Sequence, residues 1–352
     1  MPEPLPRLRL DLDFIPSSSP EQPGLIIRDP YHYSDALLVV PPSLVQFLEF
    51  FDGVRTESDM REMLFRASGR LDLGEVAEQL VTALSSAGFL DNEIFAAMRD
   101  ERRSDFAAQS VREPAHSGSA YPDTAVELRE GLEAFMREAP AAPARNGNLF
   151  GIAVPHVSFE GGWRCYASAY GLLRPEHRER TFVILATSHY GQPETFGLTR
   201  KAFQTPLGEA QADAPLVDWL ASHGGDAVCM EDYCHSFEHT VEFQVLFLQH
   251  MLGARVRILP ILCGSFAHSI MNGGMPEDDD RVRQFLDALV ELREREGDRL
   301  FWVLGVDMAH MGARYGDQFA VEAGDGVMNE NHALWVMITQ KTVFVAAIQT
   351  VP

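Results

Sequence analysis

Three histidines follow short apolar runs in the sequence. His156 follows GIAVP, His189 follows VILATS, and His310 follows VLGVDMA. A single histidine after a strand is most often a hydrogen-bonded loop residue, but three in such positions favour a shared site. Neutral imidazole is the commonest metal ligand, and two histidines with one carboxylate bind iron while leaving positions open for O₂ and substrate. We therefore predict that His156 and His189 are metal ligands.

The carboxylate of such a site would come from Asp307, three residues before His310. From the sequence alone, the same aspartate suits the N-cap of the turn that follows equally well. We keep both roles open and predict Asp307 and His310 as residues that complete the metal shell. The expected metal is Fe(II) or another divalent transition metal.

The segment FEHTVEFQVLFLQHML is the second dense group of polar residues. Its apolar residues have helical spacing, and His239 lies near the expected start of the helix. Imidazole titrates near neutral pH, so that His239 in the cleft suits a general acid or base, and we predict it as the catalytic residue. An ordinary surface pair of His239 with Glu242 explains the spacing equally well.

The elements that must position these residues begin near residue 148. From there, β-rich apolar runs alternate with helical segments, the runs being LFGIAVP, TFVILAT, VRILPILCG and LFWVLGVD. Nearly all-apolar strands that alternate with helices are typical of an α/β domain with a largely parallel sheet flanked by helices. Ligands of such sheets gather at the carboxyl ends of the strands, which is where the histidines stand.

The rest of the chain predicts a smaller domain ahead of this one. Residues 1–24 are rich in proline and serine, which favours an extended lead-in. Residues 25–92 contain two short strand-like runs followed by helical spacing, which predicts a small α+β domain. Residues 93–115 are charged and alanine-rich, which predicts a helical or mobile linker. Residues 116–352 form the α/β domain, with an atypical C-terminal tail from about residue 325.

Composition excludes several classes of partner and compartment. The chain of 352 residues has 29 basic and 51 acidic residues and a net charge of −22, which argues against binding to nucleic acid or to an anionic membrane surface. Its 4 cysteines form no CxxC pair, so neither a disulfide framework nor a zinc knuckle is indicated. No unbroken apolar stretch suits a signal peptide. We expect a soluble, cytoplasmic protein.

Seven ordered segments resemble the Memo-like protein family, known in prokaryotes as protein B of the AmmeMemoRadiSam system. They are SGSAYP, GIAVPHVSFEGGWRCYASAYGLL, VILATSHYG, TPLGEAQAD, FEHTVEFQVLFLQ, ILPILCG and VLGVDMAHMGARYGD. This resemblance implies an α/β fold related to the class III extradiol ring-cleaving dioxygenases, which are non-haem Fe(II) enzymes. It also implies His156 and His189 as metal ligands and His239 as a residue lining the site, with the acid/base role of its dioxygenase equivalent.

The chain departs from this family at one expected ligand. Animal members place a cysteine in the motif DFCHWG, whereas DMAHMG puts Ala309 at that position here. Alanine cannot coordinate a metal. A metal site would therefore need Asp307, His310, Asp232 or Cys234 to complete it, or would bind its metal more weakly.

The N-terminal domain has a resemblance of its own. The segments FFDGVRTESDMREML and VAEQLVTALSSAGFL resemble PqqD-like winged-helix domains, which bind peptides or dock partners. A structural lid without a binding role fits the same pattern.

These observations lead to three functional hypotheses. The first is a metal-dependent redox protein, possessing a dioxygenase-like cleft. The second is a non-catalytic protein that binds a peptide or partner and works with a radical-SAM enzyme. The third hypothesis is a metal-assisted hydrolase, because a bound metal hydroxide needs only two or three protein ligands.

Overall fold

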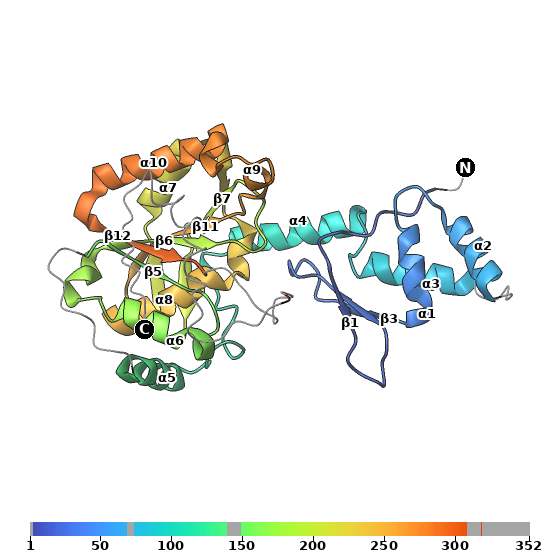
Figure 1. Ribbon diagram of the computed structural model, residues 1–352, viewed down its shortest axis with the longest axis horizontal. Helices are drawn as coiled ribbons and strands as arrows, with labels where there is room; N and C mark the ends of the chain where they lie inside the picture. The colour runs from blue at the N-terminus through green and yellow to red at the C-terminus, as the bar shows by residue number, and fades with distance from the viewer. Residues whose placement is uncertain (1–2, 69–73, 139–148, 308–317, 319–352) are drawn as a thin grey trace. The chain divides into compact units, whose positions relative to one another are not determined.

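The structure, a computed structural model, describes residues 3–68, 74–138, 149–307 and 318 (Figure 1). The chain divides into two compact units, Met1–Ala108 and Gln109–Pro352. Each unit is described by itself below.

The N-terminal unit combines a small antiparallel sheet with helices. The sheet has the order β1-β2-β3, and its inner face buries Ile27 and Val40 in a shared hydrophobic core. The strands are β1 (Asp13–Pro16), β2 (Leu25–Arg28) and β3 (Leu37–Val40), and the helices are α1 (Pro42–Val45), the 3₁₀ helix η1 (Gln46–Phe50), α2 (Glu57–Ser68), α3 (Gly74–Ser86) and α4 (Glu93–Ala108).

Two segments that the sequence placed outside the small domain belong to this unit. The extended lead-in predicted for residues 1–24 is packed onto the unit, because Leu5 and Leu12 are buried in the core and Asp13–Pro16 forms β1. Arg9 is also buried and pairs with Asp29, which fixes this segment to the unit. Much of the expected linker is the helix α4, which buries Phe95 and Phe106.

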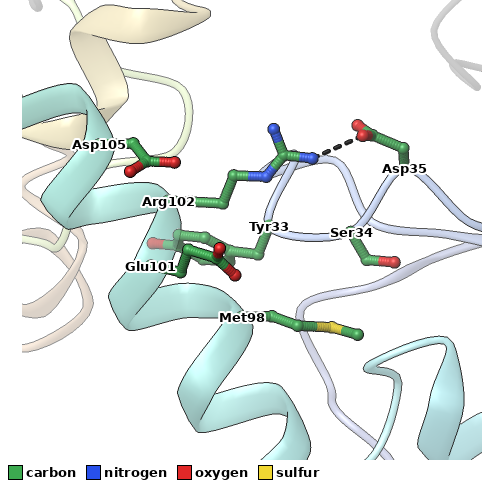
Figure 2. Close-up of a pocket in the computed structure, with 7 residues that line it drawn as sticks. All are labelled: Tyr33, Ser34, Asp35, Met98, Glu101, Arg102 and Asp105. Atoms are coloured by element: carbon green, nitrogen blue, oxygen red, sulfur yellow. Dashed lines mark hydrogen bonds and ion pairs between the residues drawn. The ribbon is translucent and has the colours of Figure 1, made fainter. Parts of the chain in front are cut away.

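A pocket of about 330 Å³ lies in this unit between α4 and the loop that precedes β3 (Figure 2). Arg102 on α4 reaches across it to the carboxylate of Asp35. The lining residues are Tyr33, Ser34, Asp35, Met98, Glu101, Arg102 and Asp105.

The C-terminal unit is built around a nine-stranded sheet. Seven of its strands have the order β4-β8-β9-β11-β6-β12-β5; β7 pairs with β11, and β10 pairs with β7. The central pairs β11–β6, β6–β12 and β12–β5 are all parallel, which confirms the predicted mostly parallel sheet. The strands are β4 (Val111–Arg112), β5 (Gly151–Val154), β6 (Thr181–Thr187), β7 (Phe196–Leu198), β8 (Ala202–Thr205), β9 (Gly208–Ala212), β10 (Val228–Met230), β11 (Arg257–Cys263) and β12 (Leu300–Gly305).

Helices cover both faces of this sheet (Figure 1). The first face carries α7 (Ala214–His223) and α10 (Asp280–Glu296), whose apolar residues share a core with β6, β11 and β12. The opposite face carries α5 (Ala125–Glu138), α6 (Phe159–Tyr170) and α8 (His239–Leu252). Shorter helices lie in the connections: η3 (Pro175–Glu179), η4 (Gly225–Ala227), η5 (Tyr233–Ser236), α9 (Ala267–Met271), η6 (Pro276–Asp278) and η7 (Gly297–Arg299).

The strand register explains why distant residues meet. In the parallel pairs, Gly305 at the end of β12 lies opposite Val154 of β5 and Ala186 of β6. His156, His189 and Asp307 each stand two residues beyond the last residue of β5, β6 and β12. Because the carboxyl ends of parallel strands share one edge of a sheet, all three residues lie at that edge.

Across the described ranges, the structure contains no helix that is both long enough and apolar enough to cross a membrane.

All four cysteines have free thiols, and Cys234 is buried. The expectation that no disulfide framework holds the chain together is therefore confirmed.

Candidate metal site

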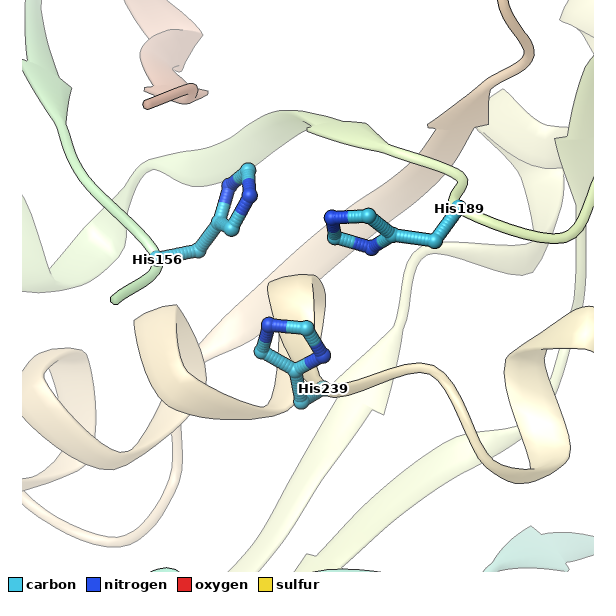
Figure 3. A group of neighbouring side chains, drawn as sticks. All are labelled: His156, His189 and His239. Carbon is cyan, nitrogen blue, oxygen red and sulfur yellow. The ribbon is translucent and has the colours of Figure 1, made fainter. Parts of the chain in front are cut away.

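Three imidazoles meet at the carboxyl edge of the sheet. His156 follows β5, His189 follows β6, and His239 is the first residue of α8. Figure 3 shows the three rings pointing toward one another from these three elements. Their centroids lie 5.1 Å apart for His156 and His189, 5.5 Å for His156 and His239, and 5.1 Å for His189 and His239.

This set of donors fits a transition metal. One ligand atom from each ring lies within 4.8 Å of the other two, and no other such group occurs among the residues that the structure describes. Two nitrogens on one ion, each at about 2.1 Å, stand no more than about 4.2 Å apart, so small ring movements suffice to bring all three donors to one ion. Imidazole nitrogen suits zinc, copper, iron and nickel.

A single carboxylate contacts two of these histidines. Glu238 is the N-cap of α8 and is only 1% exposed. Its Oε2 accepts the backbone N–H of His189 at 2.8 Å, and Nδ1 of His189 lies 3.2 Å from both carboxylate oxygens. Its Oε1 lies 3.0 Å from Nδ1 of His239 and accepts the backbone N–H of His239 at 2.9 Å.

The electrostatics of this group follow from burial and from these contacts. Burial alone would raise the pKa of Glu238, but the hydrogen bonds from His189 and His239 outweigh it and hold the pKa well below its usual range. The hydrogen bond to Glu238 raises the pKa of His189. Burial lowers the pKa of His156, despite the opposing effect of Asp307. The carboxylate is therefore ionised beside two imidazoles.

Asp307 lies directly beside His156. Its Oδ1 accepts the backbone N–H of His156 at 2.7 Å, and its Oδ2 is 3.6 Å from Nε2 of the same residue. Nδ1 of His156 lies 3.1 Å from the carbonyl oxygen of Gly305. The structure thus places the predicted carboxylate at the site, although it is not one of the three groups within 4.8 Å of one another.

The start of α8 is held by buried polar groups. The hydroxyl of Thr240 donates to the carbonyl oxygen of Thr187 at 2.8 Å, which ties the helix to the end of β6. Arg112 is fully buried and donates to the carbonyl oxygens of His235 at 2.8 Å and Glu238 at 2.9 Å. These contacts fix the backbone on either side of His239.

Glu242 does not form the surface pair with His239 that the sequence allowed. It is fully buried, and its carboxylate binds the guanidinium of Arg112 and the hydroxyl of Tyr121. It also accepts the backbone N–H groups of Ala115 at 3.2 Å and His116 at 3.1 Å. That interpretation is therefore wrong, because the inner face of α8 at Glu242 faces an arginine rather than solvent.

His116 is a neighbour of the site that the sequence reasoning missed. Its ring centroid is 5.6 Å from that of His239, and its Nε2 lies 2.7 Å from the carbonyl oxygen of Phe237. Burial lowers the pKa of His116. The sequence does contain a signal for this residue, because His116 immediately precedes SGSAYP, one of the segments that carry the family resemblance.

The other candidate ligands lie elsewhere or outside the described residues. His310 and Ala309 belong to a range that the structure does not describe. Asp232 caps the 3₁₀ helix η5 by accepting the backbone N–H of Cys234 at 3.0 Å. The buried thiol of Cys234 has a pKa raised by burial and by Asp232, which opposes formation of a thiolate ligand.

Known proteins match the unit that carries this site. Residues 112–342 match the family described as Memo-like protein. A MEMO1 family protein of Aquifex aeolicus (strain VF5) is 27% identical over 292 residues, which cover 83% of this chain and 73% of the relative. A MEMO1 family protein of Thermococcus kodakarensis is 29% identical over 210 residues, covering 58% of this chain and 67% of the relative.

The Aquifex match is longer than the family match. Because only ten residues follow residue 342, the additional aligned residues lie mostly before residue 112, so that the similarity reaches into the N-terminal unit. The family match itself spans more than half of the chain and includes all three histidines of the site. On this match, the chain belongs to the Memo-like protein family.

Proposed function

We propose that the protein is a metal-dependent oxidoreductase, related to the class III extradiol dioxygenases, in which His156, His189 and His239 hold Fe(II) or a similar divalent ion. The observation that supports this most is the group of three imidazole donors within 4.8 Å at the carboxyl edge of the sheet. When bound, such an ion supplies Lewis acidity and one-electron redox chemistry with O₂.

The residues around the ion have separate roles in this proposal. His156 is buried, and the carboxylate of Asp307 fixes it in place by accepting its backbone N–H. His189 and His239 are more open, with side chains 40% and 28% exposed, and so face the direction from which a substrate enters. Aromatic rings behind the imidazoles limit the access of water to them. The ring centroid of Phe243, for example, lies 5.0 Å from that of His239.

A second assignment gives His239 the proton-transfer role and makes Asp307 the third ligand. The position of Asp307 Oδ2, 3.6 Å from Nε2 of His156, favours it, because two histidines and one carboxylate form the common non-haem iron site. His310 stays a candidate ligand of that set. Retention of metal by a His239→Ala variant that has lost turnover would support this assignment.

The test is elemental analysis of protein purified without oxygen. The parent is expected to contain close to one equivalent of iron or another transition metal, and a His156→Ala, His189→Ala double variant is expected to contain none. His223→Ala is the matched control, because His223 is an exposed histidine on α7, where its ring stacks on Trp219. Equal trace metal in parent and double variant would contradict the proposal.

The identity of the metal separates two reaction classes. If the metal is iron, an oxygen-dependent reaction is favoured, and the next measurement is oxygen uptake with aromatic and thiol substrates. Zinc favours a metal-assisted hydrolase instead, because three histidines are also the ligands of hydrolytic zinc sites with an open position.

A second candidate function is binding rather than catalysis. Here the N-terminal unit acts as a PqqD-like winged-helix module that docks a peptide or a radical-SAM enzyme of the AmmeMemoRadiSam system. The separate hydrophobic core of this unit and its pocket of about 330 Å³ favour this role. We place such a complex in the cytoplasm, where four free thiols stay reduced.

The docking role is tested by deleting residues 1–108. Under this hypothesis the truncated chain loses capture of the radical-SAM enzyme but keeps the circular dichroism of a folded α/β unit. Capture by the truncated chain at the level of the full chain would count against docking through the N-terminal unit.

A further inference from the structure

We infer that Glu238 is a positioning residue that orients His189 and His239 together, by accepting a hydrogen bond from Nδ1 of each ring and so presenting both Nε2 atoms to one ion. This inference rests on the proposed metal site and adds to it the residue that couples two of its ligands. Glu238 itself touches no metal in this assignment.

The contacts show that Glu238 receives more donors than a helix cap requires. A cap needs only the first backbone N–H groups of its helix, and Glu238 accepts those of His239 at 2.9 Å and Thr240 at 3.4 Å. It also accepts the backbone N–H of His189, from a loop 49 residues earlier, and lies within 3.2 Å of two imidazole nitrogens. Both the main chain and the ring of His189 are therefore fixed from the start of α8.

These contacts decide the tautomer of both rings. An ionised carboxylate has no hydrogen to donate, so that an imidazole nitrogen bonded to it must carry the proton. With Nδ1 protonated, Nε2 of a neutral imidazole is the nitrogen with a free lone pair. His156 follows the same rule through a backbone carbonyl, because its Nδ1 lies 3.1 Å from the oxygen of Gly305.

The carboxylate also makes the two imidazoles better donors. A ligating histidine that donates its other N–H to a carboxylate is held in orientation and is more basic, and loss of such a partner typically lowers metal affinity about 10–100-fold. Here one buried carboxylate serves two ligands. The substitution Glu238→Gln keeps the size of the side chain but replaces one carboxylate oxygen with a donor NH₂ group. In either orientation this NH₂ group faces the backbone N–H of His189 or of His239, so the amide cannot accept from all the donors that the carboxylate accepts.

The experiment combines two measurements on the full-length protein. The first is ¹⁵N spectroscopy of histidine-labelled, metal-free protein above the pH of imidazole titration, in which single His→Ala variants assign each ring. The parent is expected to show the Nδ1–H tautomer for His189 and His239, and Glu238→Gln is expected to lose it for at least one ring. Nε2–H tautomers for both rings in the parent would overturn the inference.

The second measurement is affinity for Fe(II) without oxygen, and for Co(II), by competition with a chelator. Glu238→Gln is expected to bind about 10–100-fold more weakly than the parent, and Glu238→Asp, which keeps the charge but is shorter, is expected to fall between them. Asp279→Asn is the matched control, because Asp279 caps α10 through the backbone N–H groups of Arg281 and Val282. Its metal affinity is expected to stay within about twofold of the parent's.

The outcomes separate this inference from the proposed function. A parent that binds metal no better than the His156→Ala, His189→Ala double variant overturns the metal site, while the nitrogen spectra still decide whether Glu238 sets the tautomers. Equal affinity of the parent and a folded Glu238→Gln variant overturns the positioning role alone. If Glu238→Gln does not fold, the metal affinity of Glu238→Asp and the nitrogen spectra of the parent decide whether Glu238 positions the two rings.

Discussion

Asp307 and His156 are 151 residues apart in the sequence, yet the carboxylate of Asp307 accepts the backbone N–H of His156 at 2.7 Å. The parallel pairing of β5 with β12 brings them together, because each residue stands two positions beyond the end of its strand. The same carboxylate has its second oxygen 3.6 Å from Nε2 of the histidine. Asp307 therefore contacts both the backbone and the ring of a candidate ligand.

Substitutions of Asp307 separate these two roles. Asp307→Asn retains an acceptor for the backbone N–H of His156 but removes the charge. We expect its unfolding free energy to change by less than about 1 kcal/mol and its affinity for Fe(II) to fall about tenfold. Asp307→Ala leaves the N–H without this acceptor and should cost about 1–3 kcal/mol. Equal stability of the two variants in urea unfolding would contradict this role.

The buried pair of Arg112 and Glu242 predicts a large loss of stability. Both residues are fully buried. Removing either charge leaves the other without its partner, which typically costs about 3–5 kcal/mol. We expect losses of this size for Arg112→Met and Glu242→Gln, measured by chemical unfolding. In the double variant, the loss should be smaller than the sum by about 1–3 kcal/mol. Simple additivity would show that the two side chains do not interact.

Two glycine-to-alanine substitutions should have opposite effects. A Cβ at Gly264 would clash with the carbonyl oxygen of Gln192, in the loop that follows His189. We expect Gly264→Ala to lower the unfolding free energy by about 1–3 kcal/mol. A Cβ at Gly131 in α5 would meet nothing within 4 Å, so Gly131→Ala should raise stability by up to about 1 kcal/mol through helix propensity. Similar midpoints for both variants in thermal unfolding would contradict this contrast.

Acid stability should depend on Glu231. Burial opposes its ionisation, but hydrogen bonds from Lys201 and Thr199 outweigh burial and lower the pKa of Glu231 below the ordinary 4.5. Because the pKa of Glu231 is lower in the folded than in the unfolded protein, its ionised carboxylate stabilises the fold at pH values above the unfolded-state pKa. This stabilisation is lost as the pH falls through the folded-state pKa. The stability difference between the parent and Glu231→Gln should therefore be constant above about pH 5 and shrink below pH 4.5. Urea titrations at several pH values test this, and a difference independent of pH would disprove it.

The substitution Arg9→Met should destabilise the N-terminal unit and leave the metal site in the C-terminal unit intact. Arg9 and Asp29 form a buried ion pair at 3.0 Å, and Arg9 also donates to the carbonyl oxygen of Gly88 at 2.9 Å. Arg9→Met leaves the Asp29 carboxylate without this partner and should cost the unit about 3–5 kcal/mol.

Two spectroscopic probes can follow that prediction. All four tryptophans lie after residue 108, so that tryptophan fluorescence reports only on the C-terminal unit, whereas far-ultraviolet circular dichroism reports on both. Arg9→Met should shift part of the circular dichroism transition to lower urea and leave the fluorescence midpoint and the metal affinity unchanged. A shift of the fluorescence midpoint by the same amount would show that the two units unfold together.

The amino-acid sequence alone predicts the family, the mostly parallel sheet and the position of His156 and His189 at the ends of strands. These features follow from local pattern, because apolar runs fix the strands and the residue after a strand is fixed by the chain. The pattern also placed His239 at the start of a helix, as observed.

The contacts between side chains from distant parts of the chain could not be predicted in this way. Glu238 reads as a residue of the first helical turn, and nothing in its spacing shows that a loop 49 residues away brings His189 onto its carboxylate. Glu242 likewise reads as a surface residue until Arg112, 130 residues earlier, is packed against it. Periodicity shows which face of an element is buried, whereas the partner of a buried charge depends on strand order and register, which are set by contacts between residues far apart in the chain.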